Sequence, residues 1–104
     1  MSADYSIEQP LRADIDALAG PVVLEFGTAW CGYCQAAQPV IASALSGRRV
    51  RHIKVEDGRG RQLGRSFHVK LWPTLIFLSN GKEVARVVRP TSGEAIAKVL
   101  AMIG

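Results

Sequence analysis

Apolar residues recur along the chain in short runs that predict β-strands. The first run, residues 22–26, is apolar except for Glu25 and is typical of a central strand buried on both faces. Asn80-Gly81 predicts a tight turn, so we expect the last two runs to pair as an antiparallel hairpin. The expected strands cover residues 22–26, 50–55, 75–78 and 84–88.

A second period, typical of helices, fills the segments around these strands. Ser6 is expected to cap the first helix, and Gly20-Pro21 to end it. Pro39 is expected to kink the second helix, and Thr91, with Glu94 three residues later, to cap the last. The expected helices run from Ser6 to Leu18, from Cys31 to Leu45, around Leu63 and Phe67, and from Thr91 to Ile103.

The expected order is helix, strand, helix, strand, helix, strand, strand, helix. Right-handed crossovers place helices on both faces of a sheet whose first half is parallel, and the hairpin makes its far half antiparallel. We therefore expect an α/β fold with a central mixed sheet of four to five strands flanked by helices on both faces. A length of 104 residues with 48% hydrophobic content suits one domain over residues 1–104, with residues 1–6 as a flexible arm or a short edge strand.

The chain has two cysteines, Cys31 and Cys34, which lie where the first strand is expected to turn into a helix. Unpaired N–H groups and the helix dipole at that N-terminus favour an anion, so the pKa of the Cys31 thiol should fall. Cys34 follows one turn later, close enough to form a disulfide with Cys31. The pair therefore indicates thiol–disulfide exchange.

Three other interpretations of the cysteine pair are weaker. A metal site within one chain usually needs four ligands, but there is no second Cys-x-x-Cys, and His52 and His68 lack a finger-like spacing. The two cysteines could instead be buried structural residues. That would not explain their position, because a Cys-x-x-Cys at a strand-to-helix junction is the specific signal of a redox site. The third alternative is a homodimer that shares a metal or iron–sulfur cluster between two Cys-x-x-Cys pairs.

The stretch Trp30-Cys31-Gly32-Tyr33-Cys34 resembles the active site of the thioredoxin family. Trp72-Pro73-Thr74 is similar to the family's cis-proline followed by threonine, and Ser79-Asn80-Gly81-Lys82 is similar to its hairpin turn. The resemblance extends from about Leu11 to the end of the chain and implies the thioredoxin fold.

The resemblance implies an oxidoreductase with no organic cofactor and no metal, because the two cysteines carry the electrons. Cys31 would attack a substrate disulfide, and Cys34 would resolve the mixed disulfide. Glu25 falls where the family has a buried carboxylate. Burial should raise the pKa of Glu25, so that it accepts the proton of Cys34 through a water molecule. The alternative for Glu25 is a side chain that reaches the surface and pairs with a cation.

The implied substrate site surrounds the cysteines. A cis peptide bond before Pro73 would bring backbone groups beside Cys31, where an extended substrate strand could add to them. Trp30 is expected at the surface of this groove rather than in the core. The expected substrate-binding residues are Trp30, Gly32, Tyr33, Trp72, Pro73 and Thr74.

The basic neighbour of Glu25 has two candidates. If the spacing to Pro73 is the same as in the family, Lys54 falls beside the carboxylate. If the loop at residues 57–60 is longer than in the family, His52 falls there instead. The sequence leaves both open.

Several positions depart from the usual thioredoxin pattern. Gly27 stands where thioredoxins usually carry a second tryptophan, and we expect the ring of Trp72 to fill that space. Tyr33 replaces the usual proline between the cysteines, which makes the motif similar to that of bacterial disulfide isomerases. We therefore expect a reduction potential above the about −270 mV of thioredoxin, towards the about −180 mV of disulfide isomerases. Arg89 replaces a glycine that normally leaves room for substrate, and Trp72 is larger than the usual residue at its position. Together they predict a narrower substrate range.

The formal net charge of +4 is concentrated in residues 48–65. No stacking aromatics interleave this run, so we expect a solvated face rather than a nucleic-acid site. Residues 1–8 have no signal-peptide pattern, and no apolar run reaches the roughly 20 residues that span a bilayer, so we expect a cytoplasmic protein without a membrane partner. The basic run contains Arg48, Arg49, Arg51, His52, Lys54, Arg59, Arg61 and Arg65.

Two functions from different classes follow from these observations. The first is a monomeric thiol–disulfide oxidoreductase, either a reductase or an isomerase, that serves cell redox homeostasis. Its partners would be proteins with disulfides and a thioredoxin-reductase-like or other redox partner. The alternative is a non-catalytic binding module that docks one protein partner through the basic run or the surface of Trp30 and Trp72.

Overall fold

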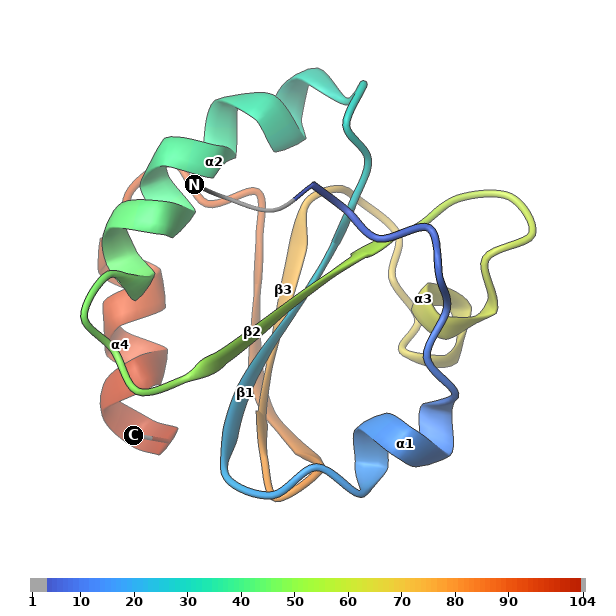
Figure 1. Cartoon of the computed structure of the whole chain (residues 1–104). Helices are drawn as coiled ribbons and strands as arrows, with labels where there is room; N and C mark the ends of the chain where they lie inside the picture. Colours follow the sequence, from blue (N-terminus) through green and yellow to red (C-terminus); the bar gives the residue numbers. More distant parts are fainter. Residues whose placement is uncertain (1–3, 104) are drawn as a thin grey trace.

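The computed structural model describes residues 4–103, which form a sheet of four strands in the order β2-β1-β3-β4 (Figure 1). β1 pairs with β2 in parallel, and the other two pairs, β1–β3 and β3–β4, are antiparallel. This arrangement confirms the mixed sheet expected from the sequence. The strands are β1 (Pro21–Gly27), β2 (Arg51–Glu56), β3 (Thr74–Ser79) and β4 (Lys82–Val88). The helices are α1 (Arg12–Asp16), α2 (Gly32–Leu45), α3 (Gln62–Ser66) and α4 (Glu94–Ile103).

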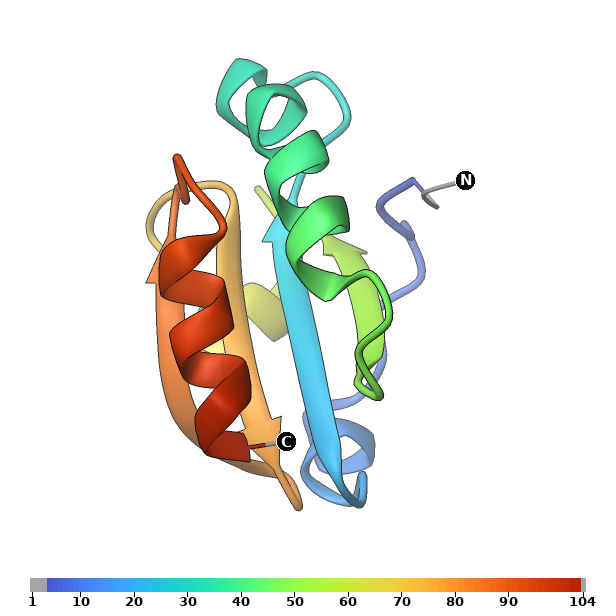
Figure 2. The same ribbon diagram turned by 90° about the vertical axis from the view of Figure 1, so that its left-hand side faces the viewer.

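Helices cover both faces of the sheet, as expected. Figure 2 shows α2 and α4 side by side over one face, with α3 behind the strands. Under α2 and α4 the buried residues are Val23, Ala37, Ile41, Leu75, Phe77, Ile96, Val99 and Leu100. On the α1 and α3 face they are Ile15, Val22, Leu24, Phe26, Val55, Leu63, Phe67, Ile76 and Leu78. Each large apolar side chain buried in this way contributes about 1.5–3 kcal/mol, so both faces support the sheet.

The first helix begins later than its apolar pattern predicts. α1 starts at Arg12, and Leu11, expected on its buried face, is 68% exposed. Ser6 does not cap a helix. Its N–H donates to the carbonyl of Lys54 at 3.0 Å, and its carbonyl accepts from the N–H of Glu56 at 2.9 Å. Pairing with β2 satisfies these backbone groups, so this segment is a single bridge on the sheet edge. The part of the expected arm at residues 1–3 lies outside the described residues.

The last helix also begins later than predicted. α4 starts at Glu94, and the N–H of Ala97 donates to the carbonyl of Gly93 at 2.9 Å. Gly93 therefore immediately precedes the helix, and the prediction that Thr91 caps it is wrong. α2 does run through Pro39, as the sequence predicts, and ends at Leu45.

The strand pairing brings two distant segments of the chain to one end of the sheet. The last residues of β1 lead through residues 28–30 into α2, and Phe26 pairs with Thr74 at the start of β3. Because the two strands are antiparallel, the segment before Thr74 lies beside the segment after Phe26. Pro73 and Cys31 are thereby placed near each other.

Candidate active site

Cys31 occupies the N-terminus of α2, as the sequence predicts. Its backbone is extended, with φ −80° and ψ 122°, and its sulfur accepts the N–H of Cys34 at 3.3 Å. Burial raises the pKa of the Cys31 thiol, but hydrogen bonds from Cys34 and Tyr33 and the charge of Arg89 outweigh burial. The pKa of Cys31 therefore lies below its ordinary value, which favours the reactive thiolate.

Cys34 lies deeper and has the opposite tendency. Its side chain is 1% exposed, against 8% for Cys31. Burial, together with the neighbouring Cys31 sulfur, raises the pKa of Cys34 to about 11. Both cysteines are free thiols in this structure. Cys34 thus keeps its proton at neutral pH and must give it up in order to attack a disulfide.

Glu25 is fully buried on β1, on the face that α2 covers. Its Oε2 accepts hydrogen bonds from the Tyr5 hydroxyl and from Gln38 Nε2, the latter at 3.0 Å. Its Oε1 lies 2.8 Å from His52 Nε2. Burial raises the pKa of Glu25, but the hydrogen bonds from His52, Gln38 and Tyr5 outweigh burial and lower it. The expected rise in this pKa is therefore wrong, because an apolar environment was assumed where donors surround the carboxylate.

Both candidate basic neighbours of Glu25 are present, but they act differently. The β1–β2 register pairs Lys54 with Glu25, yet Lys54 Nζ donates to Gln38 Oε1 at 2.7 Å and lies 4.7 Å from the ring centre of Tyr5. His52 is the residue whose side chain contacts the carboxylate. Lys54 fixes the Gln38 amide, because its oxygen must face the ammonium and its nitrogen then faces Glu25.

Tyr5 fills the space beside Gly27. A Cβ at Gly27 would lie 2.7 Å from the Tyr5 hydroxyl oxygen and 2.7 Å from the Cys34 sulfur, so no side chain fits there. The expectation that Trp72 fills this space is wrong. The ring of Trp72 lies edge-on to that of Trp30, with 5.6 Å between their centres.

The sequence did not predict Tyr5 or Gln38 as parts of the site. Gln38 follows Cys34 by four residues, which places both on one face of a helix, and this spacing was an available signal. The missing tryptophan at Gly27 signals that another side chain must fill the space. Nothing in the local sequence around Tyr5 identifies it as that side chain.

The outer surface of the site is aromatic. Trp30 is 73% exposed, as expected, and Tyr33 is 61% exposed. Trp72 is partly buried, and its Nε1 donates to Asp57 Oδ2 at 2.8 Å. The peptide bond between Trp72 and Pro73 is cis. These side chains form a rim around the Cys31 sulfur on which a substrate chain could lie.

Arg89 holds the turn at Pro73. Its backbone is left-handed, with φ +49°. Glycine, the usual residue at this position in thioredoxins, adopts this conformation without strain. Its N–H donates to the carbonyl of Pro73 at 2.9 Å, and its Nε donates to the carbonyl of Trp72 at 2.8 Å. Two carbonyls of this turn are therefore already paired, and a substrate strand would have to compete with Arg89 for them.

Gly32 and Thr74, also expected at the substrate site, lie at different depths. Gly32 is exposed, with open space where a Cβ would stand. Thr74 is buried, and its hydroxyl donates to the carbonyl of Leu71 at 2.6 Å. Thr74 thus supports the turn from beneath, and its contact with substrate stays a prediction.

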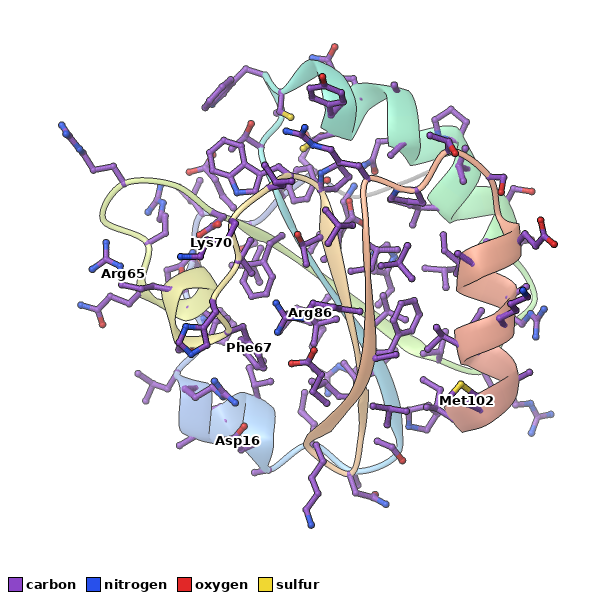
Figure 3. All side chains as sticks on the ribbon, turned by 180° about the vertical axis from the view of Figure 1, so that it is seen from behind. Asp16, Arg65, Phe67, Lys70, Arg86 and Met102 are labelled. Atoms are coloured by element: carbon purple, nitrogen blue, oxygen red, sulfur yellow. The ribbon has the colours of Figure 1, made fainter. Side chains whose placement is uncertain are left out.

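The two ends of the basic run lie apart. Arg48 and Arg49 line a hollow beside α4, whereas Arg65 and Lys70 lie together near α3 (Figure 3). The six residues of β2 separate the two groups by roughly 20 Å. Among residues 4–103, no group of three or more His, Cys, Asp and Glu side chains could hold a metal ion, and no helix is long and apolar enough to cross a bilayer.

Comparisons with known proteins agree with this geometry. The family model named thioredoxin matches residues 6–102. Thioredoxin H-type 1 of Nicotiana tabacum is 35% identical over 68 residues, which cover 64% of this chain and 54% of the relative. The bifunctional thioredoxin reductase/thioredoxin of Mycobacterium leprae is 29% identical over 90 residues, 85% of this chain and 20% of the relative. The chain spans about half the length of the first curated relatives it matches.

Solved structures extend the similarity over the whole fold. Reduced thioredoxin 2 from Pseudomonas aeruginosa PAO1 is 56% identical, with a TM-score of 0.88 and coverage of 99% of this chain and 96% of that one. Trxlp from Edwardsiella tarda is 26% identical, with a TM-score of 0.72 and coverage of 85% and 88%.

Proposed function

Because the chain belongs to the thioredoxin family, we propose that it is a thiol–disulfide oxidoreductase that acts on protein disulfides through Cys31 and Cys34. One observation carries the proposal. The Cys31 sulfur accepts a backbone hydrogen bond at the N-terminus of α2, with the second thiol buried beneath it. A stabilised thiolate with a protonated thiol in reach is what an attack followed by a resolution requires.

The reaction runs in two exchanges. The Cys31 thiolate attacks one sulfur of a substrate disulfide, whose other sulfur leaves as a thiolate and takes a proton from water. Cys34 then loses its proton and attacks the Cys31 sulfur, which breaks the mixed disulfide and releases the second substrate thiolate. Two electrons have passed to the substrate, and Cys31 and Cys34 are joined as a disulfide. A redox partner must reduce this bond before the next turnover.

The direction, partners and compartment are parts of the same proposal. A thioredoxin-reductase-like partner is supported by the Mycobacterium leprae relative, whose name joins the two proteins in one chain. A single Cys-x-x-Cys that needs reduction suits the cytoplasm. The hydrogen bonds and the Arg89 charge at Cys31 stabilise the thiolate and hence the reduced form, which supports a potential above that of thioredoxin.

The test is reduction of insulin by dithiothreitol in the presence of four chains: the wild type, Cys31→Ser, Cys34→Ser and the double variant. We expect turnover only with the wild type. In a separate reaction without dithiothreitol, reduced Cys34→Ser should form a mixed disulfide with insulin that stays unresolved, and Cys31→Ser should not, because Cys34 is buried. Unchanged turnover with the double variant would contradict the proposal.

The binding-module alternative makes a different prediction. If the fold only docks a partner, the double variant should restore growth of a deletion strain as well as the wild type does. We expect it to fail. Bound zinc or visible colour in the purified protein would instead indicate a shared metal or iron–sulfur site.

A further inference from the structure

The hydroxyl group of Tyr5 lies between the Cys34 thiol and the Glu25 carboxylate. It donates a hydrogen bond to Glu25 Oε2. On its other side it interacts with the Cys34 side chain, and both the Tyr5 oxygen and the Cys34 sulfur lie 2.7 Å from where a Cβ of Gly27 would stand. A phenol oxygen can accept one proton while it donates another. The position therefore links a group that must lose a proton to a group that can take one.

Contacts from three directions hold Tyr5 in this place. Its ring is 9% exposed and packs with Cys31, Cys34 and Trp72. Gln38 Nε2 donates to its oxygen at 3.1 Å. The backbone of the next residue, Ser6, is hydrogen-bonded to β2, which fixes the main chain beside the ring.

We propose that Tyr5 relays the proton of Cys34 to Glu25 while Cys34 attacks the mixed disulfide. The inference deepens the proposed function and depends on it. The Cys34 S–H gives its proton to the Tyr5 oxygen, and the Tyr5 O–H gives its own proton to Glu25 Oε2. Cys34 then holds the electron pair that forms the bond to the Cys31 sulfur. The bond between Cys31 and the substrate sulfur breaks, and the substrate leaves as a thiolate.

The two transfers accompany the attack, and no tyrosinate forms. Burial and the charge of Glu25 raise the pKa of Tyr5, so its hydroxyl does not ionise by itself. As the Cys34 sulfur bonds to Cys31 it loses electron density, and its proton becomes more acidic. The hydrogen bonds from His52 and Gln38 keep Glu25 ionised until that moment. His52 also lines a groove of about 720 Å³ between α2 and β2, through which Glu25 can later exchange its proton with solvent.

Besides Glu25 on β1, the charged and titratable groups of the relay and its surroundings come from four segments. From α2 they are the two thiols, and from β2 they are His52 and Lys54. Arg89, after β4, acts on Cys31. The fourth segment contributes Tyr5 itself. The pH dependence of the second exchange must therefore be compared with that of variants in which these groups are replaced.

The test separates the two exchanges in time. A bis(nitrobenzoate) disulfide in stopped flow releases one coloured thiolate when Cys31 attacks and a second when Cys34 resolves the adduct. The first phase depends on the reagent concentration and the second does not. In Tyr5→Phe we expect the second phase to slow by about tenfold to a hundredfold at pH 7, with the first phase unchanged.

The pH profile distinguishes a relay from a structural role. As the pH approaches the Cys34 pKa of about 11, hydroxide removes the proton directly, so the wild type and Tyr5→Phe should converge. A packing defect would slow the second phase at every pH. If Tyr5 acts through Glu25, adding Tyr5→Phe to Glu25→Gln should slow the second phase little further.

Thr28→Val is the matched control. Its hydroxyl is also buried and lies near Cys34, and within the described part of the chain Oγ1 has no hydrogen-bond partner. We expect both phases to keep their wild-type rates. An unchanged second phase in Tyr5→Phe, equal slowing of both phases, or equal slowing in Thr28→Val would overturn the relay. A wild type that never releases the second thiolate would overturn the proposed function itself.

Discussion

The guanidinium carbon of Arg89 lies 3.7 Å from the ring centre of Tyr33, over the N-terminal turn of α2. The same side chain donates to the carbonyl of Trp72. Arg89 thus contacts both segments that flank the Cys31 sulfur, the one that contains Tyr33 and the one that contains Trp72. It also adds a positive charge there that lowers the pKa of Cys31.

Replacing Arg89 with glycine should make Cys31 less reactive at neutral pH. Glycine accepts the φ of +49°, so the backbone can persist while the charge is lost. We expect the alkylation rate of Cys31 by iodoacetamide at pH 6–7 to fall severalfold, because each unit of pKa is tenfold in thiolate below the pKa. Arg48→Ala, at the far end of β2, is the control for net charge and should leave the rate unchanged.

The same Arg89→Gly variant should accept bulkier substrates. It frees the carbonyl of Trp72 and uncovers the face of the Tyr33 ring that the guanidinium covers. We expect kcat/KM for large protein disulfides to rise relative to that for a small peptide disulfide. Steady-state rates with the two substrates measure this, and an unchanged ratio would show that Arg89 does not limit the substrate range.

A methyl group at Gly27 should disturb both stability and resolution. Its Cβ would stand 2.7 Å from the Tyr5 oxygen and from the Cys34 sulfur, closer than packed atoms allow. We expect Gly27→Ala to lower the free energy of unfolding by about 1–3 kcal/mol in urea titrations and to slow the second phase of thiolate release. Gly32→Ala has open space at its Cβ and should not destabilise the fold.

Glu25 should contribute stability that is lost in acid. Its pKa is lowered in the folded state, so the folded protein binds its proton less readily than the unfolded chain. The contribution is therefore fully present above the unfolded pKa of about 4.3, and it disappears as the pH falls through the folded value. In urea titrations between pH 3 and pH 7, Glu25→Gln should lose less stability than the wild type.

Glu83 provides the comparison for this acid effect. Its pKa is also lowered, chiefly through a hydrogen bond from Arg86, but this pair is about one third exposed. Its contribution should be smaller and should fade in high salt, whereas that of buried Glu25 should persist. Equal pH profiles for the wild type and Glu25→Gln would contradict the hydrogen-bonded state described for Glu25.

Hydrophobic periodicity was sufficient to predict the strands, because their side chains are buried on fixed faces. It failed at Ser6, where Ile7 and Leu11 match a helical face but stay exposed. The backbone of Ser6 finds partners on the open edge of β2, and this tertiary pairing outweighs the local helix signal. A pattern in one segment cannot reveal that an edge elsewhere is unpaired.

The cysteines, Glu25 and the aromatic rim were predictable because a motif of short span contains or flanks them. The role of Tyr5 was not, since it depends on a cavity left by Gly27 22 residues later and on a hydrogen bond to Glu25 20 residues later. The pKa of Glu25 was mispredicted for the same reason. Its donors Tyr5, Gln38 and His52 come from three separate segments.

The central claim is tested most directly by equilibrating the protein in glutathione buffers of known potential and following Trp30 fluorescence together with the mass of the trapped thiols. We predict one two-electron transition between the Cys31–Cys34 dithiol and disulfide, at a potential above the about −270 mV of thioredoxin. The transition should disappear in Cys31→Ser. A transition at or below that potential would contradict the account of the Cys31 thiolate, and a pair that never equilibrates with glutathione would contradict thiol–disulfide exchange itself.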